Sequence, residues 1–460
     1  MNSIPTPSRR QLLQGVSCGF GYMALAGLTT EAARAEESRR NPLAARQPHF
    51  APKAKRVIFL CMRGGPSHVD TFDYKPKLTT DSGKAAPKQR RRKLLGTPWK
   101  FAKRGKSGLQ VSELFPNVAK HADDLCVVNG MHADVPTHPE CFVQLHTGSF
   151  QFVRPSMGAW VLYGLGTENQ DLPGFVTISP PRNVGGTQNF GSAFLPGVYQ
   201  GTAIGQTGRA VNQAAVGDLR NNGLSSQLQR KQVDFIQQLN RGLLERNPDN
   251  PHLEGIIESY ELAFRMQRAV PKVMNLSDES QPTLDAYGIG KRATNVFGRQ
   301  CLMARRFAAA GVRYIELTHQ NWDQHKGLRK RLTANCKATD QPIAALLADL
   351  KRLDLLKDTL VVWGGEFGRT PHVKNKDGRD HNAKGFTFWM AGGGVRGGMN
   401  YGKTDEYGIE AVENKVHFHD LHATILHLLG LNHKQLTYRY AGRDFRLTDV
   451  HGRVVKDIIA

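Results

Sequence analysis

Continuous apolar runs that follow amphipathic helices are the feature that most limits how this chain can fold. The run KRVIFLCM at 55–62 lacks polar alternation, which is typical of a strand buried on both faces. A helix is expected at 295–311 with a strand at 312–318, and another helix at 341–358 with a strand at 359–365. This repeated order predicts an α/β fold with a mostly parallel central sheet and helices on both faces.

The remaining expected elements extend the same pattern. Short apolar segments predict further strands at 124–131, 174–180 and 386–394. Helical periodicity predicts a long helical zone at 225–270 and a helix at 421–431. The region 181–223 is rich in Gly, Asn and Gln, and it is expected to form surface loops.

The N-terminus has the order of an export signal. Arg9 and Arg10 precede a short apolar run, and Ala35 is the expected last residue removed. The paired arginines predict the twin-arginine route, with its export machinery as a partner and a periplasmic or secreted product. A general secretory signal or an uncleaved anchor is the alternative. Glycines interrupt the run and no second span is found, so no transmembrane anchor is expected in the mature chain.

For the rest of the chain we expect a linker at 36–54 and one large domain at 55–460. The formal net charge is +22, and a basic inserted segment at 84–106 has ten Lys or Arg and no Asp or Glu. Such a segment is either a solvated loop or a docking surface for an anionic polymer, membrane or substrate. Nucleic acid is not expected, because no nucleic-acid-binding motif is found.

Five cysteines remain after signal removal, without a CxxC, which argues against a disulfide framework.

Ligand-type side chains follow the predicted strands, where parallel sheets bind ligands. Mixed carboxylate and imidazole groups suit zinc, manganese or iron, and added oxygen donors would allow calcium. The set is large enough for two divalent metals, which can hold the attacking and leaving oxygens of a displacement at phosphorus or sulfur. Its members are Asp70, Asp323, His325, Glu366, Asp380, His381, His417 and His419.

Several motifs together resemble the alkaline phosphatase and sulfatase superfamily. They are GGPSHVDTFDYKPKL, THPECFVQLHTG, NWDQHKG, WGGEFGRTP, GRDHN and HFHDLHATILHLLGL. Within the superfamily the chain resembles an exported bacterial branch known as domain of unknown function 1501 (DUF1501). The resemblance implies an alkaline-phosphatase-like fold over nearly all of the mature chain. It also implies metal-dependent chemistry on phosphate or sulfate esters.

The resemblance also implies roles for individual metal ligands. Asp70 takes the place of the first metal carboxylate, and Asp323 and His325 resemble a pair held by one metal. Glu366 stands where the superfamily has an Asp, with Phe367 in place of the usual His. Asp380-His381 then replaces that His, and His419 resembles the late His ligand, with His417 as its competitor.

The nucleophile is where the chain departs from the family pattern. No C-x-P-x-R motif is found, so formylglycine chemistry is not expected. Counting back from Thr147-Gly148 places the attack position on His138, beside Thr137. Three alternatives stay open: Thr137 attacks, His138 acts as a ligand or carries a phosphoryl group, or water activated by metal attacks. Arg63, Arg154 or Arg369 could hold an oxyanion, or form ordinary salt bridges.

These expectations combine into an exported metal-dependent hydrolase of phosphate or sulfate esters. The basic excess favours an anionic, possibly polymeric, substrate. The alternatives are an envelope binding or scaffold protein that keeps a metal, and a phosphotransferase of the same superfamily. A scaffold would bind polyanions without turnover, whereas a transferase would need an acceptor alcohol.

Overall fold

The computed structural model describes residues 41–87, 89–206, 223–247 and 250–460. The expected export signal at 1–35 lies outside the described residues. Among the described residues, no helix has the length and apolar character needed to cross a membrane. Residues 41–54 form an irregular segment that packs on the domain: Leu43 is buried, and the backbone amide of Ala54 donates to the carbonyl of Leu428.

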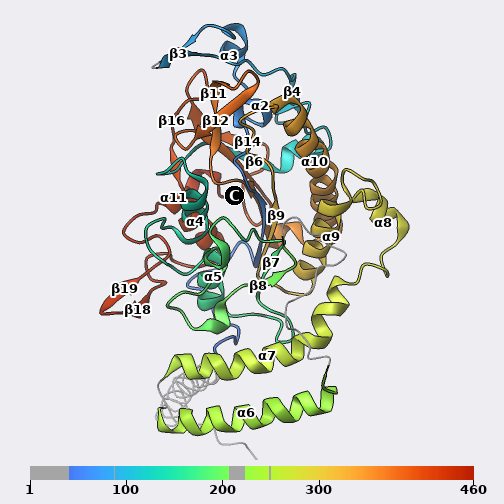
Figure 1. The fold of residues 1–460 in the computed structure, drawn as a ribbon, viewed down its shortest axis with the longest axis vertical. Helices are drawn as coiled ribbons and strands as arrows, with labels where there is room; N and C mark the ends of the chain where they lie inside the picture. The colour runs from blue at the N-terminus through green and yellow to red at the C-terminus, as the bar shows by residue number, and fades with distance from the viewer. Residues whose placement is uncertain (1–40, 88, 207–222, 248–249) are drawn as a thin grey trace, which may run out of the picture.

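A nine-stranded sheet forms the centre of the described structure (Figure 1). β13 runs antiparallel to both of its neighbours, and the other neighbouring pairs are parallel. The predicted α/β fold with a mostly parallel sheet is therefore confirmed. In spatial order the strands are β14 (Met399–Tyr401), β6 (Leu125–His132), β13 (Phe386–Ala391), β10 (Thr359–Gly364), β1 (Arg56–Met62), β9 (Tyr314–His319), β7 (Phe175–Ile178) and β8 (Thr202–Ile204), with β17 (Val416–His417) also beside β6.

Helices cover both faces of this sheet (Figure 1). α4 (His138–Thr147), α5 (Met157–Leu165) and α11 (Phe418–Leu428) lie on one side, and α9 (Asn295–Ala309) and α10 (Leu328–Arg352) lie on the other. α10 begins 13 residues before the predicted start at 341, because the helix accommodates Pro342 in its interior instead of starting beside it.

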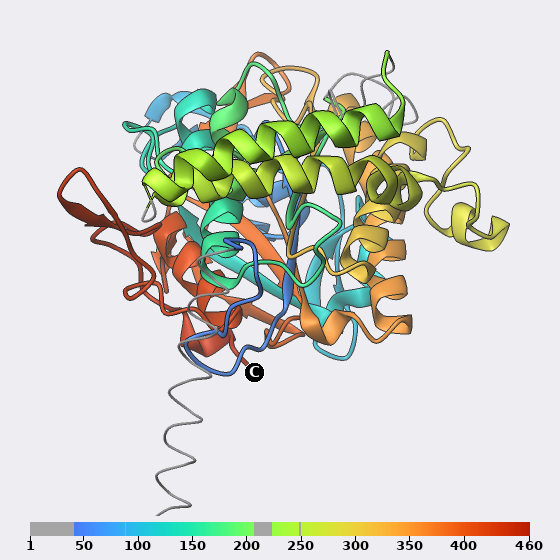
Figure 2. The ribbon, with the colours of Figure 1, turned by 90° about the horizontal axis from the view of Figure 1, so that it is seen from below.

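The long helical zone expected at 225–270 is a pair of helices, α6 (Ser226–Arg246) and α7 (Pro251–Met274). Their contacts run in opposite chain directions: Gln229 meets Gln267, and Gln237 donates to the carbonyl of Ile257. The two helices therefore form an antiparallel hairpin. Figure 2, seen from below, shows them side by side across one end of the molecule.

Smaller elements surround the sheet. A hairpin of β11 (Gly368–Lys374) and β12 (Gly378–Asn382) occupies the segment after β10. The basic segment forms β2 (Ala85–Ala86), β3 (Gln89–Lys93) and β4 (Phe101–Arg104), the last paired with β5 (Leu109–Ser112). The others are α2 (His68–Thr71), α3 (Pro76–Thr80), α8 (Gln281–Ala286), β15 (Lys403–Thr404), β16 (Ala411–Glu413), β18 (Tyr438–Tyr440) and β19 (Arg443–Phe445).

The turn after β1 fixes one edge of the later site. All seven residues of β1 are buried, between β10 and β9, as the continuous apolar run predicted. Gly64 follows with φ +115°, and a Cβ there would lie 2.5 Å from the backbone nitrogen of Asp323. Only glycine allows the loop after β9 to approach this closely. The approach places Asp323 at the carboxyl end of the central strands.

A buried pair ties α4 to the sheet beneath this edge. His146 Nε2 lies 3.0 Å from Glu316 Oε1 of β9, and its Nδ1 lies 2.7 Å from the carbonyl of Phe142. Nδ1 must donate to that carbonyl, so the His146–Glu316 contact holds a second proton. Burial alone lowers the pKa of His146, but the charge of Glu316 outweighs burial and raises it. The pair fixes the axial position of α4, which begins at His138.

Replacing His146 by Gln should destabilise the fold in a pH-dependent way. The folded-state pKa of His146 is raised, so the stabilising charge is fully present below the unfolded pKa of about 6.5 and is lost as pH rises through the folded value. We expect a loss of about 3 kcal/mol in unfolding free energy at pH 6 and a smaller loss at pH 9. Denaturant titrations of both proteins at the two pH values measure this, and a pH-independent loss would contradict the charged pair.

Candidate metal centre

Ligand-type atoms from three segments meet at the carboxyl end of the sheet. Asp323 Oδ1 lies 3.4 Å from His138 Nε2, 3.0 Å from His325 Nε2 and 3.5 Å from His381 Nε2. The Nε2 atoms of His325 and His381 are 2.9 Å apart. His138 begins α4, Asp323 and His325 follow β9, and His381 lies in β12. These four side chains form what we call the ligand cluster.

The distances from Asp323 to the three histidines fit a divalent cation, and the ligand atoms of His138, Asp323 and His381 all lie within 4.8 Å of one another. Bonds of about 2.0–2.1 Å in a tetrahedral zinc site separate neighbouring ligand atoms by about 3.3 Å. The four distances above, 2.9 to 3.5 Å, lie around that value. His138 Nε2 is also a buried atom without a hydrogen-bond partner, 3.4 Å from Asp323 Oδ1.

Glu366 orients the His138 ring from behind. Its Oε1 lies 2.6 Å from His138 Nδ1, and its two oxygens accept from the backbone amide of Gly64 at 2.9 and 3.0 Å. Burial of this carboxylate raises its pKa, but the contact with His138 and the amide of Gly64 outweigh burial and lower it. Glu366 stays ionised and holds the proton of His138 on Nδ1. This leaves the Nε2 lone pair facing Asp323.

His381 is held in a similar way, whereas His325 Nδ1 is buried without a hydrogen-bond partner. His381 Nδ1 lies 2.7 Å from the carbonyl of Pro136, so it must carry the proton and leave Nε2 bare. His325 Nδ1 lies 3.6 Å from Asp380 Oδ1. A carboxylate behind His138 and a carbonyl behind His381 are the usual arrangement at metal-binding histidines, since such a partner fixes the tautomer and ring orientation.

Cations balance the carboxylates of the site. Arg369 is fully buried, with Nη2 at 2.8 Å from Asp323 Oδ1 and Nε donating to the carbonyl of Gly65. Its Nη1 is buried without a partner. Burial would raise the pKa of Asp323, but the proximity of His138 and His381 and the charge of Arg369 lower it well below the usual range.

Asp380 is held away from the centre by two cations. Lys374 Nζ lies 2.9 Å from Oδ1, and Arg92 Nη1 lies 3.4 Å from Oδ2. Burial would raise the pKa of Asp380, but the hydrogen bond from Lys374 leads the interactions that lower it to about 2. Asp380 therefore remains a carboxylate at neutral pH. Its contacts place it behind His325, outside the group of four converging atoms.

The structure does not bring Asp70 to the ligand cluster. Asp70 is fully buried and forms a bidentate pair with Arg379, whose Nε and Nη2 lie 2.7 and 2.9 Å from its two oxygens. Ser67 Oγ donates a further hydrogen bond at 2.6 Å. These three contacts use both carboxylate oxygens, which explains its burial without a metal.

His417 and His419 also lie apart from the ligand cluster, at the start of α11. His417 Nδ1 accepts from the backbone amide of His419 and caps the helix, and its Nε2 lies 3.3 Å from Asp134 Oδ1. His419 Nε2 lies 2.7 Å from the carbonyl of Gly148, to which it donates. Helix capping accounts for His417 Nδ1 and loop anchoring for His419 Nε2, while His417 Nε2 is buried without a hydrogen-bond partner beside Asp134.

The structure separates the two residues expected at the attack position. Thr137 is the exposed N-cap of α4, and its side chain hydrogen-bonds Glu140. His138 directs Nε2 into the ligand cluster. Among the three open alternatives, this geometry matches His138 as a ligand. Sequence reasoning missed the backbone groups of Gly64 and Pro136 that orient the imidazoles, because a backbone amide or carbonyl has no residue signature.

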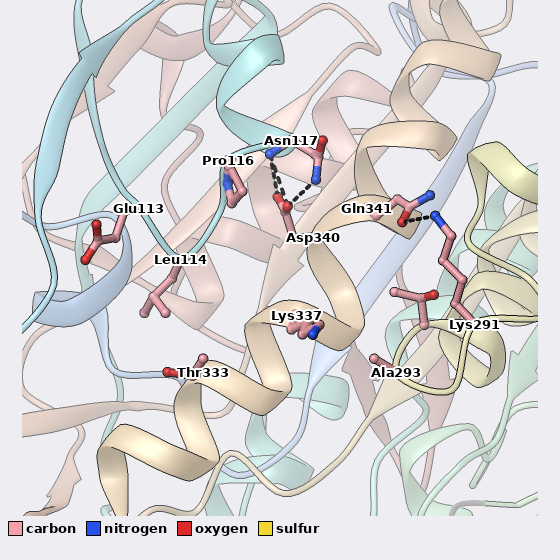
Figure 3. Close-up of a pocket in the computed structure, with 11 residues that line it drawn as sticks. Glu113, Leu114, Pro116, Asn117, Lys291, Ala293, Thr333, Lys337, Asp340 and Gln341 are labelled. Carbon is pink, nitrogen blue, oxygen red and sulfur yellow. Dashed lines mark hydrogen bonds between the residues drawn. The ribbon is translucent and has the colours of Figure 1, made fainter.

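A pocket of about 390 Å³ lies elsewhere, beside α10 (Figure 3). Asp340 faces it and accepts from the backbone amides of Asn117 and Val118 and from the Asn117 side chain. Burial raises the pKa of Asp340. Its oxygens are used in holding the segment that leads into β6, and no member of the ligand cluster lines this pocket. We assign the pocket no part in the metal centre.

Asp70→Asn should separate a structural role from a ligand role. Leaving Arg379 buried and unpaired should cost about 3 kcal/mol of unfolding free energy, while the metal content of the folded protein should not change. Elemental mass spectrometry and denaturant titration measure the two effects. The double variant Asp70→Leu/Arg379→Met removes both charges and should recover part of the stability. A loss of metal without a loss of stability would instead make Asp70 a ligand.

Comparison with known proteins places this chain in a family. Solved structures with a similar arrangement include the lipoteichoic acid synthase LtaP from Listeria monocytogenes, at 9% identity, TM-score 0.39, covering 89% of this chain and 79% of that one. The PsFucS1 sulfatase from Pseudoalteromonas sp. matches at 12% identity, TM-score 0.37, covering 84% and 68%. A TAB5 alkaline phosphatase mutant with Mg bound matches at 11% identity, TM-score 0.36, covering 84% and 100%.

At these values the likeness assigns no activity to this chain. The search of curated proteins found no match. One family model matches residues 54–459, nearly the whole of the described domain, as the sequence motifs led us to expect. The chain belongs to the family described as "Protein of unknown function (DUF1501)".

Proposed function

We propose that this protein is an exported, metal-dependent hydrolase of phosphate or sulfate esters. The observation that carries the proposal is the convergence of Asp323 Oδ1 with the Nε2 atoms of three histidines. Such a set binds zinc and similar divalent cations. A divalent cation supplies Lewis acidity that polarises the oxygens of an ester. The paired arginines of the N-terminus support export.

We propose that the ligand cluster binds one cation, whereas the sequence suggested two. His138, Asp323, His325 and His381 would hold it. In this proposal Glu366, which the sequence predicted as a ligand, positions the imidazole of His138. A second grouping of His325, Asp380 and His381 shares His325 and His381 with the ligand cluster, and a third, buried grouping holds Cys61, His146 and Glu316. Since Lys374 and Arg92 already occupy Asp380, we propose that this second grouping does not bind its own cation.

The chain's own residues would bind and orient the ester. Arg369 keeps one guanidinium nitrogen, Nη1, without a partner beside Asp323, so it can donate to an ester oxyanion. Glu366 keeps the imidazole of His138 directed into the site. His138 is assigned as a ligand and Thr137 is exposed at the N-cap of α4, so water is the attacking group in this proposal.

A scaffold with a structural metal is the second candidate, because four protein ligands can close a tetrahedral site. The solvent exposure of the ligand cluster favours the enzyme over the scaffold. The side chain of Asp323 is 41% exposed and that of His138 is 20% exposed, so solvent and substrate reach the cluster. Catalytic zinc sites can also expand to five ligands during reaction. A transferase of the same chemistry would differ only in needing an acceptor alcohol.

Metal content and ester turnover test the proposal together. Purified wild type should contain about one equivalent of divalent metal, His381→Ala should lose most of it, and His419→Ala should keep it. Elemental mass spectrometry measures this per folded protein. His419→Ala is the matched control, because it removes an imidazole that the sequence predicted as a ligand and that the structure places against Gly148.

Wild type loaded with metal should hydrolyse an aryl phosphate or an aryl sulfate, and His381→Ala should lose at least about a hundredfold in kcat/KM. Metal at one equivalent with no turnover on either ester, with or without an acceptor alcohol, would favour the scaffold. Two equivalents would restore the two-metal expectation. Loss of metal in His419→Ala but not in His381→Ala would overturn the ligand assignment.

Export has its own test. Replacing Arg9 and Arg10 by Lys should keep the protein in the cytoplasm, because the twin-arginine machinery reads the paired guanidinium groups. Cell fractionation and N-terminal sequencing measure the location and the cleavage point, expected after Ala35. Unchanged export of the variant would contradict the twin-arginine route while leaving the metal centre untouched.

A further inference from the structure

The α6–α7 hairpin carries large apolar side chains on its solvent side. Phe235 and Leu239 of α6 are 62% and 56% exposed, although Phe and Leu are among the residue types most often buried. Single exposed apolar residues are ordinary, whereas a contiguous group of them marks an interaction site. The exposed members on the two helices, which we call the hairpin face, are Leu228, Phe235, Leu239, Leu243, Ile256 and Tyr260.

The four members on α6 share one stripe. At about 100° per residue, positions 228, 235, 239 and 243 fall within about 80° of one another around the helix. The side chains that bond α7 lie elsewhere around α6: Gln229 meets Gln267, and Gln237 donates to the carbonyl of Ile257. The stripe therefore points away from α7, and it runs along about 22 Å of the helix.

The two members on α7 adjoin this stripe. Ile256, Tyr260 and Gln267 fall within about 40° of one another around α7. Gln267 bonds Gln229, and Gln229 lies closer to the stripe around α6 than Gln237 does. The apolar side chains of the two helices therefore lie on the same side of the hairpin and form one surface.

A row of polar residues borders the stripe on the side away from α7. Lys231, Gln238 and Glu245 are exposed and stand seven positions apart, so they lie in line along the helix. The row is basic at one end, neutral at its centre and acidic at the other end. When a second copy of α6 runs antiparallel, Lys231 meets Glu245 of the partner subunit, and Gln238 meets its own counterpart. The row is therefore complementary to itself in that orientation alone.

The apolar members are arranged about the same centre. Phe235 and Leu239 flank position 237, and Ile256 and Tyr260 flank position 258. The hydrogen bond from Gln237 to α7 joins the two helices at this level. A twofold axis at this level places Phe235 against Leu239 of the partner subunit, and Ile256 against Tyr260 of the partner subunit.

We propose that the hairpin face is the contact of a homodimer, in which two α6 helices pack antiparallel about a twofold axis near Gln238. A twofold contact uses the same surface on both copies, as the self-complementary row requires. The hairpin is about 31 Å long and about 20 Å across two helices, so each copy offers about 600 Å². The total of about 1,200 Å² lies at the lower end of specific interfaces, so we expect a dissociation constant in the micromolar range.

A membrane surface fits this face less well than a second copy does. Interfacial helices carry Lys and Arg along their polar face, whereas the row beside this stripe changes sign from Lys231 to Glu245. Anionic lipids would repel Glu245 at the edge of the stripe, and a second copy supplies it with a lysine.

The dimer leaves the metal centre accessible. Figure 1 shows α6 and α7 at one end of the molecule and β12, which carries His381, toward the other. The inference therefore stands apart from the proposed function, and loss of the dimer should leave the metal content unchanged.

Sedimentation equilibrium over a range of protein concentrations tests the dimer. Purified wild type should dimerise, and Leu239→Lys should raise the dissociation constant at least about a hundredfold, because symmetry brings two lysines into the apolar contact. Val296→Lys is the matched control: this valine is 47% exposed on α9, outside the hairpin, and its replacement should leave the constant unchanged. Far-UV circular dichroism checks that both variants are folded.

A charge exchange tests the orientation of the two copies. Lys231→Glu or Glu245→Lys alone brings like charges together twice in the antiparallel dimer, so each should weaken dimerisation about tenfold. The double variant Lys231→Glu/Glu245→Lys restores opposite charges and should recover a dissociation constant close to that of wild type. In a parallel dimer each residue would meet its own counterpart, so single variants that dimerise as wild type does would reject the antiparallel contact.

Three further outcomes would overturn the inference. A monomer at all concentrations would reject the dimer, and a dimer that Leu239→Lys does not weaken would place the contact on another surface. Binding of the monomer to anionic phospholipid vesicles, lost in Leu239→Lys, would assign the face to a membrane. None of these results bears on the hydrolase, which metal content and ester turnover test, and a protein without turnover could still form this dimer.

Discussion

The buried carboxylate of Glu366 is the interaction on which the site depends. It joins the end of β10 to the turn after β1 through the amide of Gly64, and to the start of α4 through His138. An ionised group with no solvent exposure is costly unless it is fully bonded, so each of these contacts is needed. The same bonds that stabilise the carboxylate fix the imidazole of His138. Stability of the fold and geometry of the site are therefore set by one side chain.

Charge balance explains why a divalent cation fits the ligand cluster. Its three carboxylates face three cationic side chains, so the protein part is close to neutral when the imidazoles are neutral: Asp323, Glu366 and Asp380 against Arg369, Lys374 and Arg92. Burial lowers the pKa of His138, but its two carboxylate neighbours outweigh burial and raise it, so a proton can occupy this space. A divalent cation would displace that proton and leave the site positive, which favours an anionic substrate.

The sequence predicted the sheet well, because strands buried on both faces leave continuous apolar runs such as that of β1. It also predicted that Asp323, His325 and His381 gather at the strand ends, since parallel strands end at the same edge. It could not assign Asp70, because a carboxylate after a strand has the same sequence signature whether it binds a metal or a buried arginine. The partner, Arg379, is 309 positions away along the chain.

The two histidines at the start of α11 show that a short motif has the same ambiguity. A His-x-His pair at a helix start reads as a metal motif, yet one imidazole caps the helix and the other anchors a loop. The start of α10 was misplaced for a different reason. Proline is favoured at the first position of a helix, and only tertiary packing reveals that Pro342 lies inside one.

The most direct test of the account is a crystal structure of the metal-loaded protein with anomalous data collected at the absorption edge of the bound metal. The account predicts one anomalous peak at about 2.0–2.2 Å from Asp323 Oδ1 and from the Nε2 atoms of His138, His325 and His381. Glu366 and Asp380 should remain outside bonding distance, behind their imidazoles. A peak bonded to Asp70 or His419, or two peaks sharing Asp380, would contradict the single centre described above.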